Sequence, residues 1–214
     1  MQEINTKDPF VFNFSKAGSA QRVVVNWPTD EQWITRARAG RSVMRTLGGG
    51  KTMSLPASEE ALEKADLDLF RAILVEPKGD VDEEFAMRLV EILDRGSIAS
   101  IEPAGDLFVI GLKVLGAQGY PAVLTKHTLR APTFREERKW RNRYSQLVSH
   151  QGSKYEIRTN PELAGEMYDE LTQKAEGYSE GSRVPIHHKV AVVGRLMAMV
   201  LSDEDQEVED EDHF

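Results

Sequence analysis

The stretch DLFVIGLKVLGAQGYPAVLTKHTLRAPT, residues 106–133, decides the fold that we predict for this chain. Large apolar residues stand at positions 108, 110, 112 and 114, which is the period of a half-buried strand. Glycine and proline then mark a turn, and a second run typical of a strand follows. Pro132 and Thr133 end that run, because proline has no N–H to donate and threonine can cap a helix. The stretch therefore predicts a β-hairpin that leads directly into a helix.

The start of the chain repeats this pattern. DPFVFNF, which begins at Asp8, matches DLFVIGL, which begins at Asp106, and NWPTDEQW shares its Pro-Thr pair with RAPTFREE. VDEEFAMRLVEIL, from Val81, matches VPIHHKVAVVGRL, from Val184. The matches keep the same order at nearly constant spacing, which indicates an internal duplication. We predict two repeat units, residues 8–100 and 106–201, that pack together as two domains or as one.

Each unit is predicted to contain a β-hairpin and three helices, with a short strand after the first helix. In both units the Pro-Thr pair is followed by a capping-box residue, Gln32 or Glu136, three positions after the threonine. The first helix of each unit is expected to end at glycine, at residues 48–50 and at Gly152, because glycine adopts the left-handed conformation readily. The predicted fold class is α+β, with two copies of a β-hairpin plus three-helix unit.

The segment RTLGGGKTM, which begins at Arg45, contains the last three letters of the phosphate-binding loop G-x-x-x-x-G-K-[ST]. The first glycine of that motif would fall on Arg45, and the preceding residues have a helical pattern instead of the pattern of a buried strand. We therefore interpret the glycines as the end of a helix. A nucleotide-binding enzyme that uses Lys51 and Thr52 is the least favoured hypothesis.

The net charge of −8 comes from the end of the chain. The last thirteen residues hold eight Asp or Glu and no Lys or Arg, so residues 1–201 are balanced. Such a run is predicted to be disordered, as a solubilising tail or as an interaction segment, over residues 202–214. The chain has no cysteine, and no apolar run approaches the roughly 20 residues that span a bilayer. We expect a protein of the cytoplasm, without a membrane partner.

Two helices rich in basic residues are the most informative chemical feature. Their basic side chains form either a solvated surface or a contact site for a polyanion, such as nucleic acid or an acidic protein surface. The candidate contact residues are Arg38, Arg41, Arg45, Arg135, Arg138, Lys139, Arg141 and Arg143. A further hypothesis is that the acidic tail folds back over these residues and competes with such a ligand.

No residue is assigned a role in catalysis, cofactor binding or metal binding. His187 and His188 are adjacent, so their side chains project about 100° apart on a helix and do not form a same-face metal pair. A structural role and a proton-transfer role both stay open for them, because a partner can come from elsewhere in the fold.

NWPTDEQWITRARAGRSVMRTLGGGKT and HTLRAPTFREERKWRNRY share a Pro-Thr pair, an aromatic residue and an arginine-rich helix. In these features the chain resembles proteins encoded in phage and prophage structural gene clusters, of the tail assembly chaperone type. The resemblance implies a non-enzymatic assembly role with protein partners and no cofactor, in the host cytoplasm, and it assigns no functional residue. The acidic tail departs from that group. The alternative hypothesis is a nucleic-acid-binding regulator that uses the two basic helices and is masked by the tail.

Overall fold

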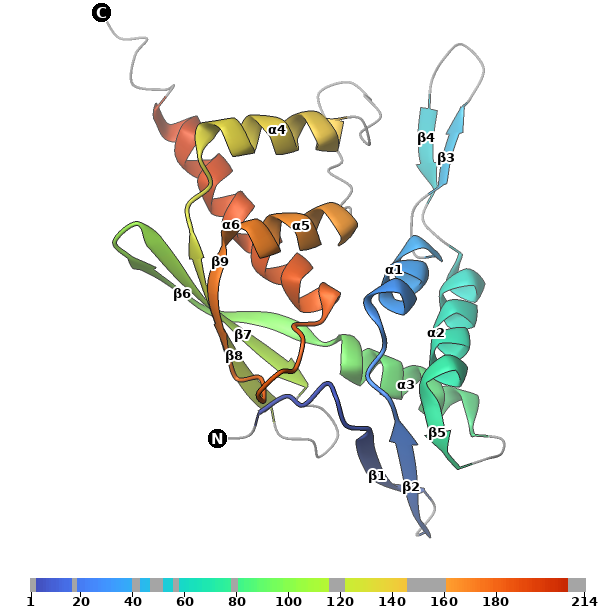
Figure 1. Ribbon diagram of the computed structural model, residues 1–214. Coiled ribbons are helices and arrows are strands. Elements are labelled where there is room, and N and C mark those ends of the chain that lie inside the picture. Colours follow the sequence, from blue (N-terminus) through green and yellow to red (C-terminus); the bar gives the residue numbers. More distant parts are fainter. Residues whose placement is uncertain are drawn as a thin grey trace, which may run out of the picture.

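The computed structural model describes residues 3–16, 19–39, 43–46, 52–55, 58–77, 81–115, 122–145 and 161–207. This part of the chain contains both helices and antiparallel sheets, which confirms the α+β class (Figure 1).

The first half of the fold contains a three-stranded sheet, a separate hairpin and three helices. The sheet has the order β1-β2-β5, and the hairpin joins β3 to β4. The strands are β1 (Phe10–Lys16), β2 (Ser19–Val25), β3 (Val43–Thr46), β4 (Thr52–Leu55) and β5 (Leu74–Glu76). The helices are α1 (Asp30–Ala39), α2 (Glu59–Ile73) and α3 (Glu83–Asp94).

The second half contains a four-stranded antiparallel sheet with the order β6-β7-β8-β9. Its strands are β6 (Gly96–Ala104), β7 (Leu107–Leu115), β8 (Ala122–Arg130) and β9 (Thr172–Glu176). Its helices are α4 (Phe134–Ser145), α5 (Pro161–Leu171) and α6 (Ile186–Glu207). Helices α5 and α6 lie on one face of this sheet (Figure 1), where α5 contacts β8 and α6 contacts β6 and β7.

The predicted starts of the first helices are confirmed by their hydrogen bonds. The N–H of Thr29 donates to Oε1 of Gln32 at 2.7 Å, and the N–H of Gln32 donates to Oγ1 of Thr29 at 3.2 Å. Thr133 and Glu136 make the same reciprocal pair at 2.8 and 3.3 Å. Each pair satisfies N–H groups that a helix start leaves free. In both halves the capped helix therefore follows its hairpin as the sequence predicts.

The pairing of the two short strands is alike in the two halves. Each follows the second helix of its half directly, β5 after α2 and β9 after α5. Each pairs antiparallel with the second strand of the hairpin, β5 with β2 and β9 with β8. The register shifts between Val24 and Val25 in one pair, and between Thr128 and Leu129 in the other. These positions correspond in the alignment that the repeated motifs define. The likeness is what a duplication predicts, although β6 has no counterpart among the described residues of the first half, and the duplication itself stays a prediction.

The end predicted for the first helix is wrong. Helix α1 ends at Ala39, and Met44, which precedes the predicted end at residues 48–50, lies in β3. β3 and β4 pair antiparallel from Val43 opposite Leu55 to Thr46 opposite Thr52, and β-branched residues at three of these positions favour a strand over a helix. The helix therefore ends before residues 48–50, which lie outside the described residues.

This correction also bears on the phosphate-loop motif. A phosphate-binding loop opens a helix whose N-terminal N–H groups face the phosphates, whereas Thr52 here is the first residue of strand β4. The segments 47–51 and 146–160, with Lys51 and Gly152, lie outside the described residues.

The end of the chain also departs from its prediction. Helix α6 runs to Glu207, so residues 202–207 are helical where the composition predicts a disordered segment. Four of these residues are acidic, and the helix continues from an apolar stretch whose residues Val192, Val193 and Leu196 are buried. Residues 208–214 lie outside the described part of the chain.

The two halves share one cluster of buried apolar side chains, which includes Trp33, Leu89, Ile110 and Leu196. Polar contacts also join them. The N–H of Ile4 donates to the carbonyl oxygen of Gly177 at 2.8 Å, and Arg183 pairs with Asp30 and donates to the carbonyl oxygen of Pro28. This packing fixes the position of α1 relative to α5 and α6.

Candidate functional site

A groove of about 640 Å³ runs between α1 and α2. Helix α2 begins at the cap Ser58, whose Oγ accepts the N–H of Ala61 at 3.1 Å, and it turns Leu69, Phe70 and Ile73 into the core. Its other side faces the groove with small residues, and α1 contributes small residues from the opposite wall. These are Ala61, Ala65 and Ala72 on α2 and Thr35 and Ala39 on α1. The groove exists because short side chains leave the space between the helices unfilled.

Arg36 closes the inner side of the groove. Its Nη1 donates to Oδ2 of Asp94 at 2.8 Å, its Nε pairs with Asp66, and its side chain is 21% exposed. Burial lowers the pKa of Arg36, but the hydrogen bonds and charges of Asp66 and Asp94 together raise it above its usual value. The guanidinium therefore holds α1, α2 and α3 together, and it is not available to a ligand.

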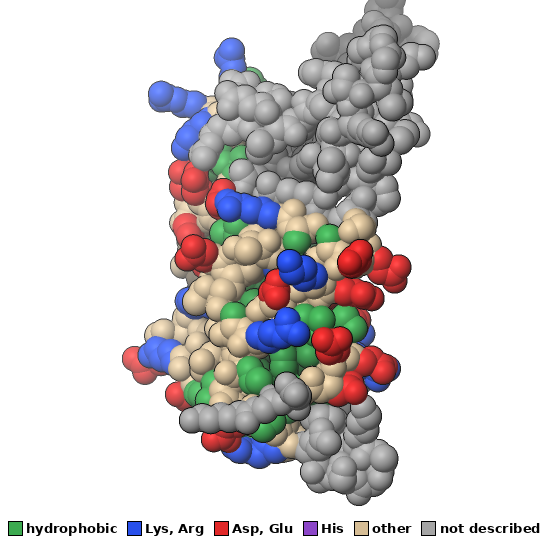
Figure 2. All heavy atoms as spheres, turned by 90° about the vertical axis from the view of Figure 1, so that its right-hand side faces the viewer, with side chains coloured by type: hydrophobic (Ala, Val, Ile, Leu, Met, Phe, Trp, Pro, Cys, Tyr) green, Lys and Arg blue, Asp and Glu red, His purple; other side chains and the backbone are tan. Residues whose placement is uncertain are grey.

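The groove is lined by charges of both signs. Its carboxylates are those of Glu31 on α1, which has no ion-pair partner among the described residues, and of Asp68 on α2, which pairs with Arg71. The exposed Glu59, Glu60 and Glu63 stand near the start of α2, outside the lining. Figure 2 views the molecule from the side of α1 and α2, and shows hydrophobic side chains near the centre with both basic and acidic side chains beside them. Lys64 is an exposed cation in the lining.

The predicted basic residues do not form one surface. Arg38, on α1, pairs with Glu162 of α5 at 2.6 Å, and Lys139, on α4, pairs with Glu170 of α5 at 3.3 Å. Helix α1 lies beside α2 and α5, whereas α4 lies at the other end of the molecule, near the last turns of α6 (Figure 1). The fold therefore separates the two basic helices and neutralises part of their charge.

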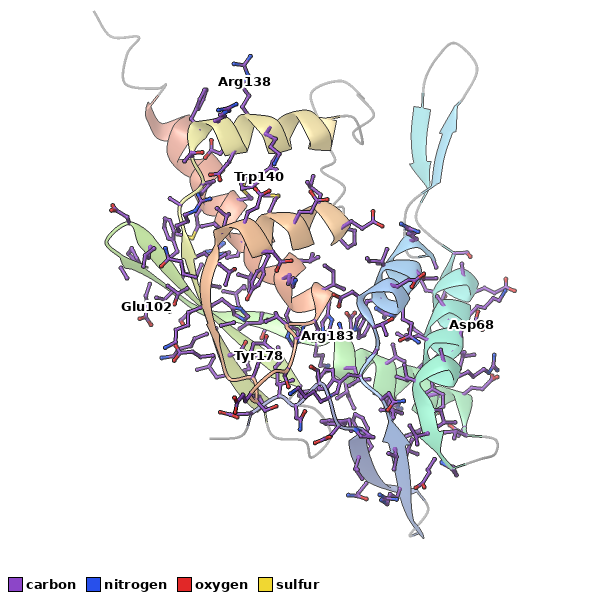
Figure 3. The ribbon with its side chains drawn as sticks, viewed as in Figure 1. Asp68, Glu102, Arg138, Trp140, Tyr178 and Arg183 are labelled. Atoms are coloured by element: carbon purple, nitrogen blue, oxygen red, sulfur yellow. The ribbon has the colours of Figure 1, made fainter. Side chains whose placement is uncertain are left out.

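Arg135 and Arg138 are exposed and have no ion-pair partner among the described residues, whereas the exposed Arg38 and Lys139 are paired. Figure 3 shows Arg138 on the outer side of α4, directed away from the fold, with Trp140 on the inner side. Of the remaining candidates, Arg41 lies outside the described residues, and only the backbone is described for Arg45 in β3 and for Arg141 and Arg143 in α4.

Phe134, which the sequence reasoning did not single out, is 74% exposed at the start of α4. Side chains four residues apart share one face of a helix, so Phe134 and Arg138 lie on the face opposite the buried Trp140. This spacing can be read from the sequence, and it places Phe134 away from the buried side of α4. An exposed aromatic ring beside two unpaired arginines makes this surface a second candidate site.

A polar network lies inside the second half of the protein. Nε2 of His127 lies 3.0 Å from Oγ1 of Thr125, and its Nδ1 lies 2.6 Å from the hydroxyl of Tyr168. The hydroxyl of Tyr178 lies 2.9 Å from Nδ1 of His188. Figure 3 shows Tyr178 between the sheet and the start of α6. The sequence reasoning missed His127, because its partners come from α5 and from the segment after β9.

Burial sets the charge state of this network. Desolvation lowers the pKa of His127 to about 4 and that of His188 well below its usual value, and it raises the pKa of both tyrosines. His187 packs against Trp33 with ring centroids 4.4 Å apart, and its pKa also falls to about 4 through desolvation. The network is therefore neutral near pH 7, and its hydrogen bonds tie β8 to α5 and α6.

Within the described residues, no group of three or more His, Asp or Glu side chains is placed to hold a metal ion. None of the helices in that part of the chain is long and apolar enough to cross a membrane. Comparisons with models of protein families, with curated proteins and with solved structures found no match for this chain.

Proposed function

We propose that this chain is a non-enzymatic structural or assembly protein of the phage or prophage type, and that it acts by protein–protein contact through the groove between α1 and α2. The observation that carries the proposal is the groove itself, about 640 Å³ in volume and lined by small side chains and charged side chains of two helices. Grooves of this kind accept an amphipathic helix, whose apolar residues fill the space. The sequence resemblance in the NWPTDEQW and RAPTFREE segments supports the assembly role.

The ion pairs favour a protein partner over nucleic acid. Binding to a phosphate backbone needs several free cations on one surface, and Arg36 and Arg38 are already paired with carboxylates of other helices. The basic surface left for a polyanion is that of α4, around Arg135 and Arg138. The alternative, a nucleic-acid-binding regulator, therefore depends on α4 alone.

The burial of the titratable groups supports a role without catalysis. His127 and His188 are 0% and 1% exposed, and a general base must reach the proton that it removes. Both imidazoles make hydrogen bonds to tyrosine hydroxyls of the same core. Their role is to fix the packing of the second half of the protein.

Cross-linking in the native host tests the proposal. The tagged protein is compared with Ala65→Trp, which fills the groove, and with Arg195→Glu, which reverses an exposed charge on α6. We expect mass spectrometry to identify particle or assembly proteins bound to the parent and to Arg195→Glu, and at least tenfold less of them on Ala65→Trp. Circular dichroism confirms that both variants are folded. Equal recovery on all three proteins contradicts the role of the groove.

The alternative has its own measurement. If the chain is a nucleic-acid-binding regulator, its affinity for DNA or RNA falls steeply with salt and is lost in Arg138→Glu. Binding of that kind, together with the absence of a protein partner, would replace the assembly proposal.

A further inference from the structure

We propose that the groove between α1 and α2 binds helix α4 of a second copy of this chain, with Phe134 inserted between the alanines and Arg138 against Glu31. The inference rests on the proposed function, because it names the partner of the same groove. It also gives a role to the exposed surface of α4.

Helix α4 has the side chains of an anchor. Phe134 is 74% exposed, more than any other large hydrophobic residue described as exposed. Arg138 stands one helical turn later on the same face, and Arg135 adjoins it. Aromatic and arginine side chains dominate the binding energy of protein interfaces, and neither arginine has a partner within the described structure. The exposed face of α4 therefore combines apolar contact area with free positive charge.

The groove has room for an aromatic side chain and a carboxylate for a cation. Its alanines allow a close approach, and its volume of about 640 Å³ exceeds that of a single aromatic side chain. Glu31 lines the groove without an ion-pair partner among the described residues, so it offers negative charge to an incoming arginine. Lys64 also lines the groove, but it is exposed, so its ammonium group can remain in water. A helix with an aromatic residue and an arginine on one face therefore fits the groove.

The two surfaces lie on separate parts of the same molecule. Helix α4 is at the end where α6 finishes, while α1 and α2 form the side seen in Figure 2 (Figure 1). A contact between two different surfaces is heterologous, so each added copy leaves one groove and one α4 free. Such contacts continue into rings or filaments.

Sedimentation velocity of the full-length protein over a range of concentrations tests the proposal. We expect the parent protein to self-associate, and its dissociation constant to rise at least tenfold in Phe134→Ser, in Arg138→Glu and in Ala65→Trp. Leu124→Ser and Arg195→Glu are matched controls, because they remove an exposed apolar residue and reverse an exposed charge away from both surfaces. These controls should associate as the parent does. Added salt should weaken association of the parent, because it screens the charge pairs.

A mixing experiment identifies the two surfaces. The double variant Phe134→Ser/Arg138→Glu retains the groove, and Ala65→Trp retains α4. We expect each to remain monomeric alone, and the mixture to form heterodimers but no larger species.

Several results would overturn the inference. They are a parent protein that stays monomeric at all concentrations, a mixture without heterodimers, and controls that weaken association as much as the test variants do. A monomeric parent that still captures an assembly protein through the groove overturns only this inference and leaves the proposed function standing. Nucleic acid binding that Arg138→Glu abolishes, in a protein that does not self-associate, would assign α4 to the alternative function.

Discussion

The buried histidines make the stability of this protein depend on pH between 7 and 5. The pKa values of His127 and His187 are lowered from 6.5 to about 4, in both cases mainly because burial disfavours the charged ring. The charge of Asp94 opposes this effect at His187 but does not cancel it. An unfolded histidine binds a proton near pH 6.5, whereas the folded one does not. The unfolded state therefore binds more protons, and stability falls as the pH falls.

The size of the effect follows from these values. Between pH 7.5 and pH 5, a histidine with a pKa of 6.5 unfolded and about 4 folded loses about 2 kcal/mol of stability. The two histidines together lose about 4 kcal/mol, which is a large part of the usual stability of 5–15 kcal/mol for a protein domain. His188, with its pKa lowered still further, acts in the same direction. The hydrogen bond with Arg130 lowers the pKa of Glu136 to about 2. The contribution of this carboxylate to stability is lost only below about pH 4.5, so it does not overlap with the pH range in which the histidines act.

Urea unfolding at pH 7.5, 6.5, 5.5 and 5.0 measures this loss. The variant His127→Gln keeps a polar side chain at this position without an imidazole, so its stability should be lower at pH 7.5 but should fall by about 2 kcal/mol less than that of the parent by pH 5. NMR titration of the ring protons gives the pKa values directly. A stability that is constant from pH 7.5 to pH 5, or a folded pKa near 6.5 for His127, would refute the reasoning.

Two further predictions concern stability, measured by urea unfolding at pH 7.5. Arg36→Met leaves Asp66 and Asp94 without their cation and should lower the free energy of unfolding by about 2 kcal/mol, after allowance for partial exposure. Arg38→Met breaks an exposed pair and should lower it by under about 1 kcal/mol. Equal losses in the two variants would contradict the role of Arg36. Gly177→Ala should destabilise by about 1–3 kcal/mol, because φ is +89° and the added Cβ would lie 3.0 Å from Leu124 O and Thr125 Cα. Gly194 is an exposed residue in the middle of α6, and a Cβ added there would have no atom within 4 Å, so Gly194→Ala should stabilise the protein by about 0.5–1 kcal/mol. If both glycine substitutions stabilise the protein, or both destabilise it, this account is contradicted.

Local patterns predicted the hairpins and the starts of the helices. The alternation at positions 108–114 and the Thr29–Gln32 capping box act over a few residues, and such signals are fully present in the sequence. The end of α1 was mispredicted, because Gly48 is the obvious stop signal while the hairpin of β3 and β4 depends on cross-strand pairing. The helical period continued through Met44 in the sequence, but the chain changes conformation after Ala39.

The candidate sites depend on contacts that no local pattern contains. Arg38 and Lys139 looked like free cations, but their partners Glu162 and Glu170 come from another helix, α5. His127 looked like an ordinary strand residue, and its role follows from Tyr168, which the packing of α5 on β8 brings to it. The groove is likewise a product of the distance between two helices. Sequence reasoning could identify which residues are basic, but not which of them remain free.

The comparison of the two halves gives a physical reason for the groove. Helix α5 packs against α1, α6 and β8, and it buries residues along most of its length. Helix α2 occupies the corresponding place in the first half, where α1 and α3 are its main neighbours, and it buries only Leu69, Phe70 and Ile73. If both helices descend from one ancestral element, α2 has kept small residues on a side that no third element of the described structure covers. Docking of another helix there would give α2 a third packing neighbour, as α5 has. A substitution such as Ala65→Trp should therefore affect association far more than folding.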